Sequence, residues 1–257
     1  MTHTEKREYL IKTLLSEQPR YRGITVPADE YAQKNLLRSL MNIRMPAPLG
    51  GEYCRIESEY LREETAAKGI TRITDLHPVE DGLYLWQGDI TTLECDAIVN
   101  AANAQMLGCF RPLHTCIDNC IHTFAGLRLR NCCDEIMRKQ GFEEPTGQAK
   151  ITPAFNLPCK YVLHTVGPIV EGRLTETQKK QLASCYTACL SLAEENGCKS
   201  VAFCCISTGV FGFPQRRAAQ IAVQTVRAYK AAAHSDIEVI FNVFKDEDYE
   251  IYRGLLG

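Results

Sequence analysis

From residue 82 onward, short apolar runs alternate with amphipathic helical patterns, and this alternation restricts the fold more than any other feature of the chain. Short apolar runs predict strands, and the longer patterns between them, with apolar residues at helical spacing, predict helices. We expect strands at 83–86, 97–99, 161–163, 201–206 and 237–244, and helices at 117–139, 176–196 and 215–233. Alternation of this kind gives a largely parallel central sheet covered by helices on both faces. We therefore predict a three-layer α/β/α fold.

The N-terminal part of the chain has a different pattern and is predicted to form a helical extension. Apolar positions at helical spacing indicate two or three amphipathic helices, which are interrupted at Pro19, at Pro27 and over residues 45–51. We divide the chain into an extension at 1–75 and an α/β domain at 76–257. The extension is expected either to shape the entrance to a site or to cover one face of the sheet. The charged run that ends at Asp248 is expected to be a solvated turn before a last helix.

Charge and cysteine content exclude several classes of protein. The formal net charge of the 257 residues is −2, and the cations are spread along the chain, so the basic stripe typical of nucleic-acid-binding proteins is absent. No apolar run approaches the roughly 18 residues of a membrane span, and the N-terminus has no apolar signal segment. The 13 cysteines, an odd number without such a segment, are expected to be reduced thiols. We expect a cytoplasmic protein with neither nucleic acid nor membrane as its partner.

Cys109, His114 and Cys116 lie close together in a segment that also contains glycine and proline. Two thiolates and one imidazole make three ligands for Zn²⁺, and a catalytic zinc leaves its fourth tetrahedral position to water or substrate. The spacing is not that of a zinc finger, because no CxxC pair precedes a second pair at the usual interval. The alternative is that these cysteines, like most free cysteines, are small buried apolar residues.

Three segments with unusual chemistry follow predicted strands, at residues 88–91, 100–103 and 207–214. In an open α/β sheet, ligands bind beyond the carboxyl ends of the strands. The last segment contains Gly209 and Gly212 and no Lys or Arg, so it can bind a diphosphate through backbone N–H groups and the helix dipole. The alternative for this segment is an ordinary connection from strand to helix that needs glycine for positive φ.

Each polar residue of these segments also has a simpler interpretation. Asp89 can accept hydrogen bonds from an exocyclic amine, or it can cap the turn that follows. Asn103 suits a sugar hydroxyl, although Asn in a loop often bonds its own backbone. Phe211 and Phe213 can pack on a sugar or a base, or they can belong to the core. Their joint position at one edge of the predicted sheet is what favours a ligand site.

Five motifs, in this order, resemble those of macrodomains, a family that binds ADP-ribose. They are GDIT at 88–91, DAIVNAAN at 96–103, PTGQA at 145–149, HTVGP at 164–168 and STGVFG at 207–212. The resemblance covers roughly residues 80 to 255 and implies that 76–257 is a macrodomain. It implies that Asp89 binds the adenine amine, that Asn103 binds the distal ribose and that the last motif binds the diphosphate. The implied ligand-binding residues are Asp89, Ile90, Asn103, Ser207, Thr208, Gly209, Val210, Phe211 and Gly212.

The chain departs from many macrodomain hydrolases at residues 108–119, where those proteins have a run of glycines. This departure, together with the N-terminal extension, resembles the zinc-containing macrodomains of bacteria, which are ADP-ribosyl hydrolases. The resemblance implies that Zn²⁺ is bound by Cys109, His114 and Cys116. It also implies that Asp118 occupies the position of an Asp that the hydrolase branch uses, so that Asp118 and Asn103 are the expected catalytic residues. The alternative for Asp118 is a helix N-cap.

The predicted function is a zinc-dependent hydrolase that removes mono-ADP-ribose from acidic side chains of modified proteins and releases ADP-ribose. Asp118 is expected to orient or deprotonate the attacking water, while zinc polarises a sugar hydroxyl or a water. The resemblance suggests as partner a lipoyl-carrier protein modified by a sirtuin-like transferase. One alternative is a reader module that binds ADP-ribose without cleaving it and carries a structural zinc. Another is a cysteine hydrolase with Cys109 or Cys116 as the nucleophile.

Overall fold

A seven-stranded, mostly parallel sheet forms the centre of the molecule in the computed structural model, which describes residues 1–257. In spatial order its strands are β2 (Pro78–Glu80), β3 (Leu83–Gln87), β9 (Glu238–Val243), β8 (Ser200–Phe203), β5 (Ala97–Ala102), β7 (Tyr161–Val166) and β6 (Ala149–Pro153). The five inner strands are parallel, and the edge strands β2 and β6 run antiparallel to their neighbours. Two further strands, β1 (Thr71–Arg72) and β4 (Leu93–Glu94), form a separate parallel pair.

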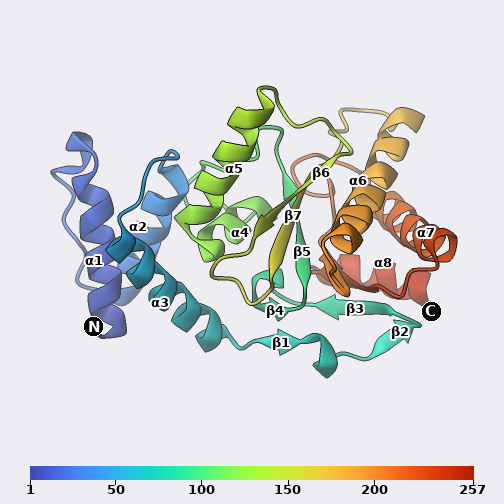
Figure 1. The fold of residues 1–257 in the computed structure, drawn as a ribbon, viewed down its shortest axis with the longest axis horizontal. Coiled ribbons are helices and arrows are strands. Elements are labelled where there is room, and N and C mark those ends of the chain that lie inside the picture. The colour runs from blue at the N-terminus through green and yellow to red at the C-terminus, as the bar shows by residue number, and fades with distance from the viewer.

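Helices lie on both sides of this sheet (Figure 1). On one side are α4 (Ile117–Ala125) and α5 (Leu127–Gln140), and on the other are α6 (Glu176–Glu195), α7 (Gln215–Ala233) and α8 (Asp246–Leu256). Val99, Leu163 and Val201 on the inner strands are completely buried. Continuous apolar strands of this kind are typical of parallel sheets covered on both faces. The predicted three-layer α/β/α fold is confirmed. None of the helices combines the length and the apolar character needed to cross a membrane.

Several details differ from the expectation. The short strands β1, β2 and β4 were not predicted, and the strand predicted at 201–206 ends at Phe203. The helix predicted at 117–139 is two helices, because Gly126 has a φ of 89° and interrupts the helical backbone. Strand β6 was not predicted, because it is an edge strand that is mostly half-buried and ends in a proline. The acidic run that ends at Asp248 is not a turn, since it forms the first turn of α8, where negative charge interacts favourably with the helix dipole.

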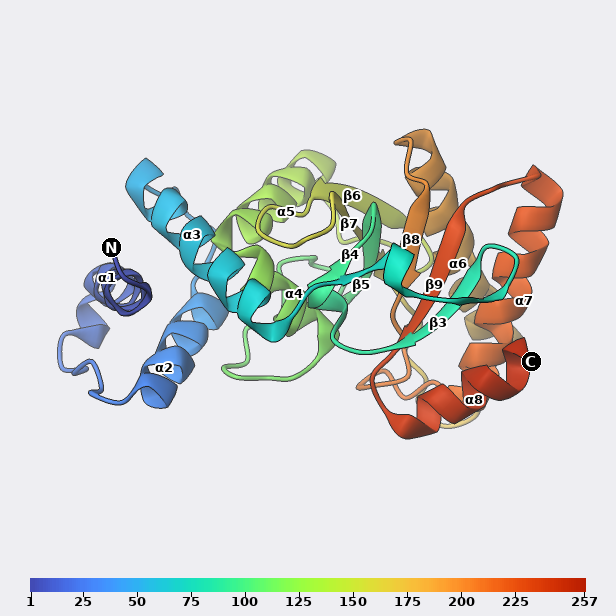
Figure 2. The ribbon, with the colours of Figure 1, turned by 90° about the horizontal axis from the view of Figure 1, so that it is seen from below.

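The N-terminal extension contains three helices, α1 (His3–Ser16), α2 (Glu30–Ile43) and α3 (Gly51–Lys68). A short 3₁₀ turn lies between α1 and α2, and strand β1 and a second 3₁₀ turn follow α3. They enclose a separate core of 11 buried apolar residues, of which Leu127 of α5 is the only one from outside these helices. Figure 2 shows the extension beyond α4 and α5, at the end of the molecule away from α7 and α8. The expected cover of one face of the sheet is therefore wrong, because α4 and α5 lie between the extension and the sheet.

Glu57 connects the extension to the start of α5. Its side chain is fully buried, and its Oε1 accepts a hydrogen bond of 3.1 Å from the backbone N–H of Leu127. This contact satisfies one of the free N–H groups at the start of the helix. Burial raises the pKa of Glu57 to about 7, although the Leu127 N–H and the positive charge of Arg128 oppose the shift. Gly126 directly precedes Leu127 and lies against the Glu57 carboxyl. The close packing of α3 against α5 therefore leaves no room for a side chain at Gly126.

Replacing Gly126 with Ala is expected to destabilise the protein by about 1–3 kcal/mol. The positive φ disfavours any side chain, and a Cβ would lie 2.6 Å from Oε2 of Glu57 and 2.8 Å from Nδ2 of Asn156. Denaturant unfolding of the variant measures the loss. Gly254→Ala is the matched control, because Gly254 lies inside α8 with open space around it and alanine favours a helix. Equal stability of the Gly126 variant and the wild type would contradict the tight junction.

Candidate functional site

A cleft of about 1030 Å³ opens at the carboxyl ends of the parallel strands. Its size is at the upper end of the range of small-molecule sites, which is about 300–1,000 Å³. The cleft brings together the three segments that were singled out in the sequence, and all the predicted site residues except Gly212 line it. The sequence thus located the edge of the sheet at which the site lies.

Asp89 lines the cleft and is held as a carboxylate. Its Oδ1 accepts hydrogen bonds from the backbone N–H and the hydroxyl of Thr91, at 3.0 and 2.6 Å, so it caps the 3₁₀ turn Ile90–Thr92. Its Oδ2 lies 2.9 Å from Nζ of Lys68, at the end of α3. Burial alone would raise the pKa of Asp89, but the Thr91 hydrogen bonds and Lys68 outweigh it and lower the pKa. The cap interpretation is confirmed, and the carboxylate still has lone pairs for an exocyclic amine.

The loop after β8 folds back on itself before α7 begins. Ser207 and Gly212 both have positive φ, 65° and 68°, and the backbone N–H of Gly212 donates to the carbonyl of Gly209 at 3.1 Å. Phe211 is half-buried and lines the cleft, whereas Phe213 is 1% exposed and belongs to the core. Of the two interpretations given for Phe213, the core interpretation is therefore the right one.

The end of β7 approaches this loop closely at Gly167. A Cβ at Gly167 would overlap the hydroxyl of Ser207, so only glycine allows the two segments to meet. The following helix α7 begins after Pro214 without a side-chain cap, which leaves its first N–H groups for a ligand or water. Val210 at the tip of the loop is 80% exposed. The loop from Ser207 to Phe211 thus presents backbone donors to the cleft, which suits an anionic diphosphate.

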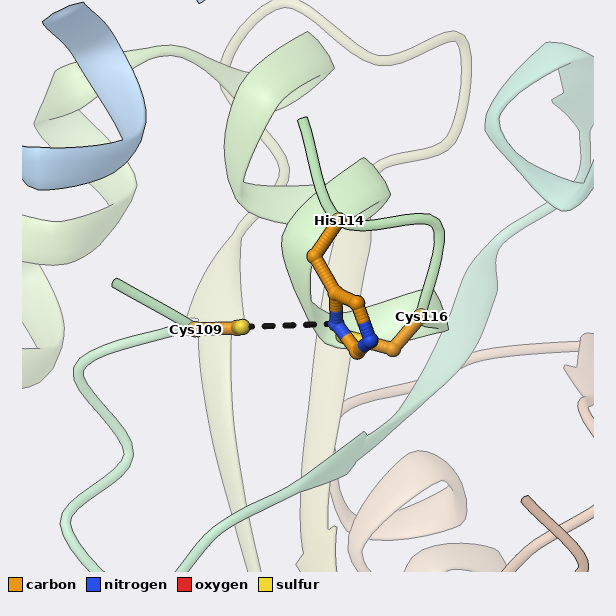
Figure 3. Close-up of side chains that lie close together, drawn as sticks. All are labelled: Cys109, His114 and Cys116. Carbon is orange, nitrogen blue, oxygen red and sulfur yellow. Dashed lines mark hydrogen bonds between the residues drawn. The ribbon is translucent and has the colours of Figure 1, made fainter. Parts of the chain in front are cut away.

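Cys109, His114 and Cys116 converge in the cleft, and Figure 3 shows their side chains pointing toward one another. Their ligand atoms all lie within 4.8 Å of one another, and Sγ of Cys109 is 3.5 Å from Nδ1 of His114. Two ligands of a tetrahedral zinc, one sulfur and one nitrogen, lie about 3.6 Å apart, given the usual Zn–S and Zn–N bond lengths. The donor set and its spacing fit Zn²⁺. The alternative of plain buried cysteines does not describe these residues, since both thiols are half-buried and line the cleft.

Cys116 also caps helix α4, because its Sγ accepts a hydrogen bond from the backbone N–H of Asn119 at 3.4 Å. Burial raises the pKa of Cys116 to about 12, so the free thiol is protonated at neutral pH. A metal ion at this position therefore has to displace a proton. The N-cap interpretation of Asp118 is wrong, because Cys116 has that role and Asp118 lies in the first turn of the helix.

Asp118 lies on the floor of the cleft and is 5% exposed. Its Oδ1 accepts a hydrogen bond of 2.8 Å from Nδ2 of Asn100 and lies 3.6 Å from Nε2 of His122. Burial raises the pKa of Asp118 to about 6, and the Asn100 hydrogen bond and the charge of Arg130 partly offset this shift. Asn100 and His122 were not assigned from the sequence. Asn100 lay inside a quoted motif, but His122 had no local signal, since it occurs in an ordinary helical pattern.

Asn103 is bonded to its own loop, as its simpler interpretation predicts. Its Oδ1 accepts hydrogen bonds from the backbone N–H groups of Gln105 and Met106, both at 3.1 Å, and its Nδ2 donates to the carbonyl of Gly108 at 3.1 Å. The amide has two N–H groups, so one remains for a ligand in the cleft. Asn103 therefore both anchors the start of the segment that contains Cys109 and lines the cleft.

Comparison with known proteins finds relatives over the whole chain. The family model described as Macro domain matches residues 99–222. A protein from Treponema medium with the name Protein-ADP-ribose hydrolase is 57% identical, and the match covers 100% of both chains. A protein with the same name from Staphylococcus aureus (strain MSSA476) is 46% identical over 96% of this chain and 93% of its own length.

Solved structures agree with this result. The Oceanobacillus iheyensis macrodomain with ADP is 37% identical and superposes with a TM-score of 0.63, covering 70% of this chain and 93% of that chain. The Trypanosoma brucei macrodomain in complex with ADP-ribose is 30% identical, with a TM-score of 0.66, and covers 85% of this chain and 95% of that chain. The fold and the sequence thus point to the same group of proteins.

Proposed function

This chain belongs to the Macro domain family and is a protein-ADP-ribose hydrolase, and we propose that it removes mono-ADP-ribose from acidic side chains in a reaction that depends on Zn²⁺. In this proposal Cys109, His114 and Cys116 bind the metal. Asp118 and Asn103 are the catalytic residues, and the cleft binds ADP-ribose.

One observation carries the zinc part of the proposal. Three zinc-type ligands converge inside the cleft, with a sulfur-to-nitrogen distance of 3.5 Å that fits a tetrahedral site. Asp118 lies only two residues after Cys116, the last of these ligands in the chain, and lines the same cleft. Because three protein ligands leave one tetrahedral position for a ligand from the cleft, the donor set is that of a catalytic site.

The other predicted site residues bind different parts of ADP-ribose. Asp89 accepts hydrogen bonds from the adenine amine, and the loop from Ser207 to Gly212 binds the diphosphate through backbone N–H groups. The free N–H of Asn103 donates to a hydroxyl of the distal ribose. Since Asn103 also holds the carbonyl of Gly108, it places that ribose beside the proposed metal ligands.

When bound, Zn²⁺ would supply Lewis-acid polarisation of a ribose hydroxyl or of a water. Asp118 orients and deprotonates the water that attacks the anomeric carbon, and the bond to the protein side chain breaks with oxocarbenium character. The hydrogen bond from Asn100 fixes one oxygen of Asp118, which leaves the other oxygen for the water. The carboxylic acid of the modified protein leaves as a carboxylate.

The most specific parts of the proposal are the type of ADP-ribosyl linkage that is cleaved and the identity of the modified protein. A carboxylate is a good leaving group, so an acidic linkage needs less protonation on departure than a serine or arginine linkage. The resemblance to zinc-containing bacterial macrodomains supports a lipoyl-carrier protein modified by a sirtuin-like transferase as the substrate.

A panel of substrates tests this function. Mono-ADP-ribosylated proteins with Asp/Glu, Ser and Arg linkages, including a modified lipoyl-carrier protein, are incubated with the enzyme, and released ADP-ribose is measured. We expect turnover of the Asp/Glu-linked proteins and at least about tenfold slower turnover of the other two linkages. Preference for a serine or arginine linkage would overturn the assignment to acidic side chains. Tight binding of ADP-ribose without turnover of any linkage would establish a reader module in place of a hydrolase.

A further inference from the structure

The segment that contains the proposed metal ligands is held by the N-terminal extension. We call residues 107–116 the ligand loop. Nη2 of Arg38, on α2, donates hydrogen bonds of 2.8 Å to the carbonyl of His114 and 3.0 Å to Oδ1 of Asn119. The same nitrogen lies 3.7 Å from Sγ of Cys120. One guanidinium of the extension thus contacts the backbone of a proposed metal ligand and the helix that follows it.

A second residue of α2, Asn42, contacts the tip of the ligand loop. It is 1% exposed, its Oδ1 accepts a hydrogen bond of 3.0 Å from the backbone N–H of Leu113, and its Nδ2 donates to Oγ1 of Thr123 at 3.0 Å. Leu113 has a φ of 56°, a backbone conformation that is unfavourable for leucine. Such a conformation persists only where surrounding contacts impose it, so Asn42 fixes the residue that directly precedes His114.

Two further side chains complete the attachment of the ligand loop. Asn119, which is fully buried, donates from Nδ2 to the carbonyls of Cys109 and Arg111 at 3.2 and 3.0 Å. Arg130 donates from Nε to the carbonyl of Leu107 and from Nη1 to the carbonyl of Met41 on α2, both at 2.8 Å. The loop is therefore bonded at its start, its middle and its end to α2, α4 and α5.

We propose that Arg38 and Asn42 are positioning residues for the metal site, so that the extension presets the ligand loop in the geometry that Zn²⁺ requires. The proposal rests on the zinc site of the proposed function. Partners of metal ligands orient them, and their loss typically costs about 10–100-fold in metal affinity. Neither Arg38 nor Asn42 belongs to the 11-residue core of the extension, so their replacement leaves that core intact.

Arg38→Ala and Asn42→Ala test the proposal in the full-length chain. Zn²⁺ affinity is measured by competition with a chromophoric chelator, and the geometry is measured from the absorption spectrum of the Co²⁺-substituted protein. We expect both variants to bind Zn²⁺ about 10–100-fold more weakly than the wild type and to show an altered Co²⁺ spectrum. Arg38→Lys retains a donor for the carbonyl of His114 and should recover part of the affinity.

Lys34→Ala is the matched control, because Lys34 lies one turn earlier on α2 and pairs only with Glu30 and Glu64 of the extension. Its Zn²⁺ affinity should stay within about twofold of the wild type, as expected for loss of surface ion pairs. Wild-type affinity and an unchanged Co²⁺ spectrum in both Arg38→Ala and Asn42→Ala would overturn the proposal. Circular dichroism identifies a variant that does not fold. If the variant of the buried Asn42 does not fold, the variant of the half-buried Arg38 decides the test.

Hydrogen exchange separates this proposal from the proposed function. In the metal-free protein, the amide of Leu113 should exchange faster in Asn42→Ala than in the wild type, because its only acceptor in the structure is the Asn42 side chain. If the wild type takes up no Zn²⁺, the zinc part of the proposed function fails, and exchange at Leu113 still decides whether α2 holds the loop. Unchanged exchange in the variant would show that α2 does not hold it.

Discussion

Asp118→Asn is expected to lower turnover of a mono-ADP-ribosylated protein by about 10²–10⁴-fold, the usual contribution of a general base. Asparagine has the same shape, and its side-chain oxygen can accept the hydrogen bond that Asn100 donates to Asp118. The amide of the variant cannot accept a proton from water, but the shape of the cleft should be unchanged. Binding of ADP-ribose, measured by calorimetry, should therefore change by less than about threefold.

Asp134→Asn is the control for this prediction. Asp134 lies on α5 and pairs with the exposed Arg138, so its replacement removes a carboxylate outside the cleft. Its turnover should equal that of the wild type. Parallel losses of turnover and of ADP-ribose affinity in Asp118→Asn would contradict a catalytic role and indicate that Asp118 only supports the cleft.

Cys116→Ser is expected to weaken Zn²⁺ binding by at least about 100-fold and to abolish most turnover. Zinc peptides with four ligands bind with about 10–16 kcal/mol, so one ligand contributes about 3 kcal/mol, or about two powers of ten. Serine is itself a favoured N-cap, so α4 should remain stable when the thiol is lost. Metal content by elemental analysis and turnover are measured on the same preparation.

Cys132→Ser tests whether the loss of metal and turnover is specific to the proposed metal ligands. Cys132 is a half-buried free thiol on α5 that does not line the cleft. We expect wild-type metal content and turnover from this variant. Full metal content in Cys116→Ser would contradict the proposed coordination. Full metal content with lost turnover would support the alternative in which Cys116 is a nucleophile.

Local sequence patterns were sufficient to predict most of the fold. Short apolar runs between helical patterns located the inner strands, because burial on both faces leaves a continuous apolar signature. Helix α7 was predicted with the bounds that the structure has. The break at Gly126 was missed, because many helices tolerate a single glycine, so an isolated glycine does not by itself predict the end of a helix. The edge strand β6 was missed because its half-buried residues lack a strong pattern.

The cleft was predictable where its residues lie at strand ends, and it was not predictable where helices supply contacts from a distance. Asp89 and Asn103 come just after strands β3 and β5, so the topology alone places them at one edge of the sheet. Lys68, which pairs with Asp89, and Arg38, which bonds the carbonyl of His114, are 21 and 76 residues away in the chain. Nothing in the local pattern around either cation indicates such a partner, because exposed cations on helices usually face solvent.

Both of these distant contacts come from the N-terminal extension. Lys68 of α3 pairs with the carboxylate expected to meet adenine, and Arg38 of α2 holds the loop expected to bind zinc. The extension therefore contacts two residues that line the cleft, Asp89 and His114, without belonging to the α/β layers. Its expected role in shaping the entrance to the site agrees with these contacts better than a role as a passive cover.

The most direct test of the account is the turnover of one enzyme preparation before chelation, after chelation and after restoration with Zn²⁺. The substrate is a mono-ADP-ribosylated protein with an acidic linkage, and elemental analysis verifies each state. Lewis-acid catalysis supplies several kcal/mol, so we predict at least about a 100-fold loss on chelation, recovery with Zn²⁺, and ADP-ribose binding in every state. Metal-free protein that hydrolyses the substrate at the full rate would contradict the account.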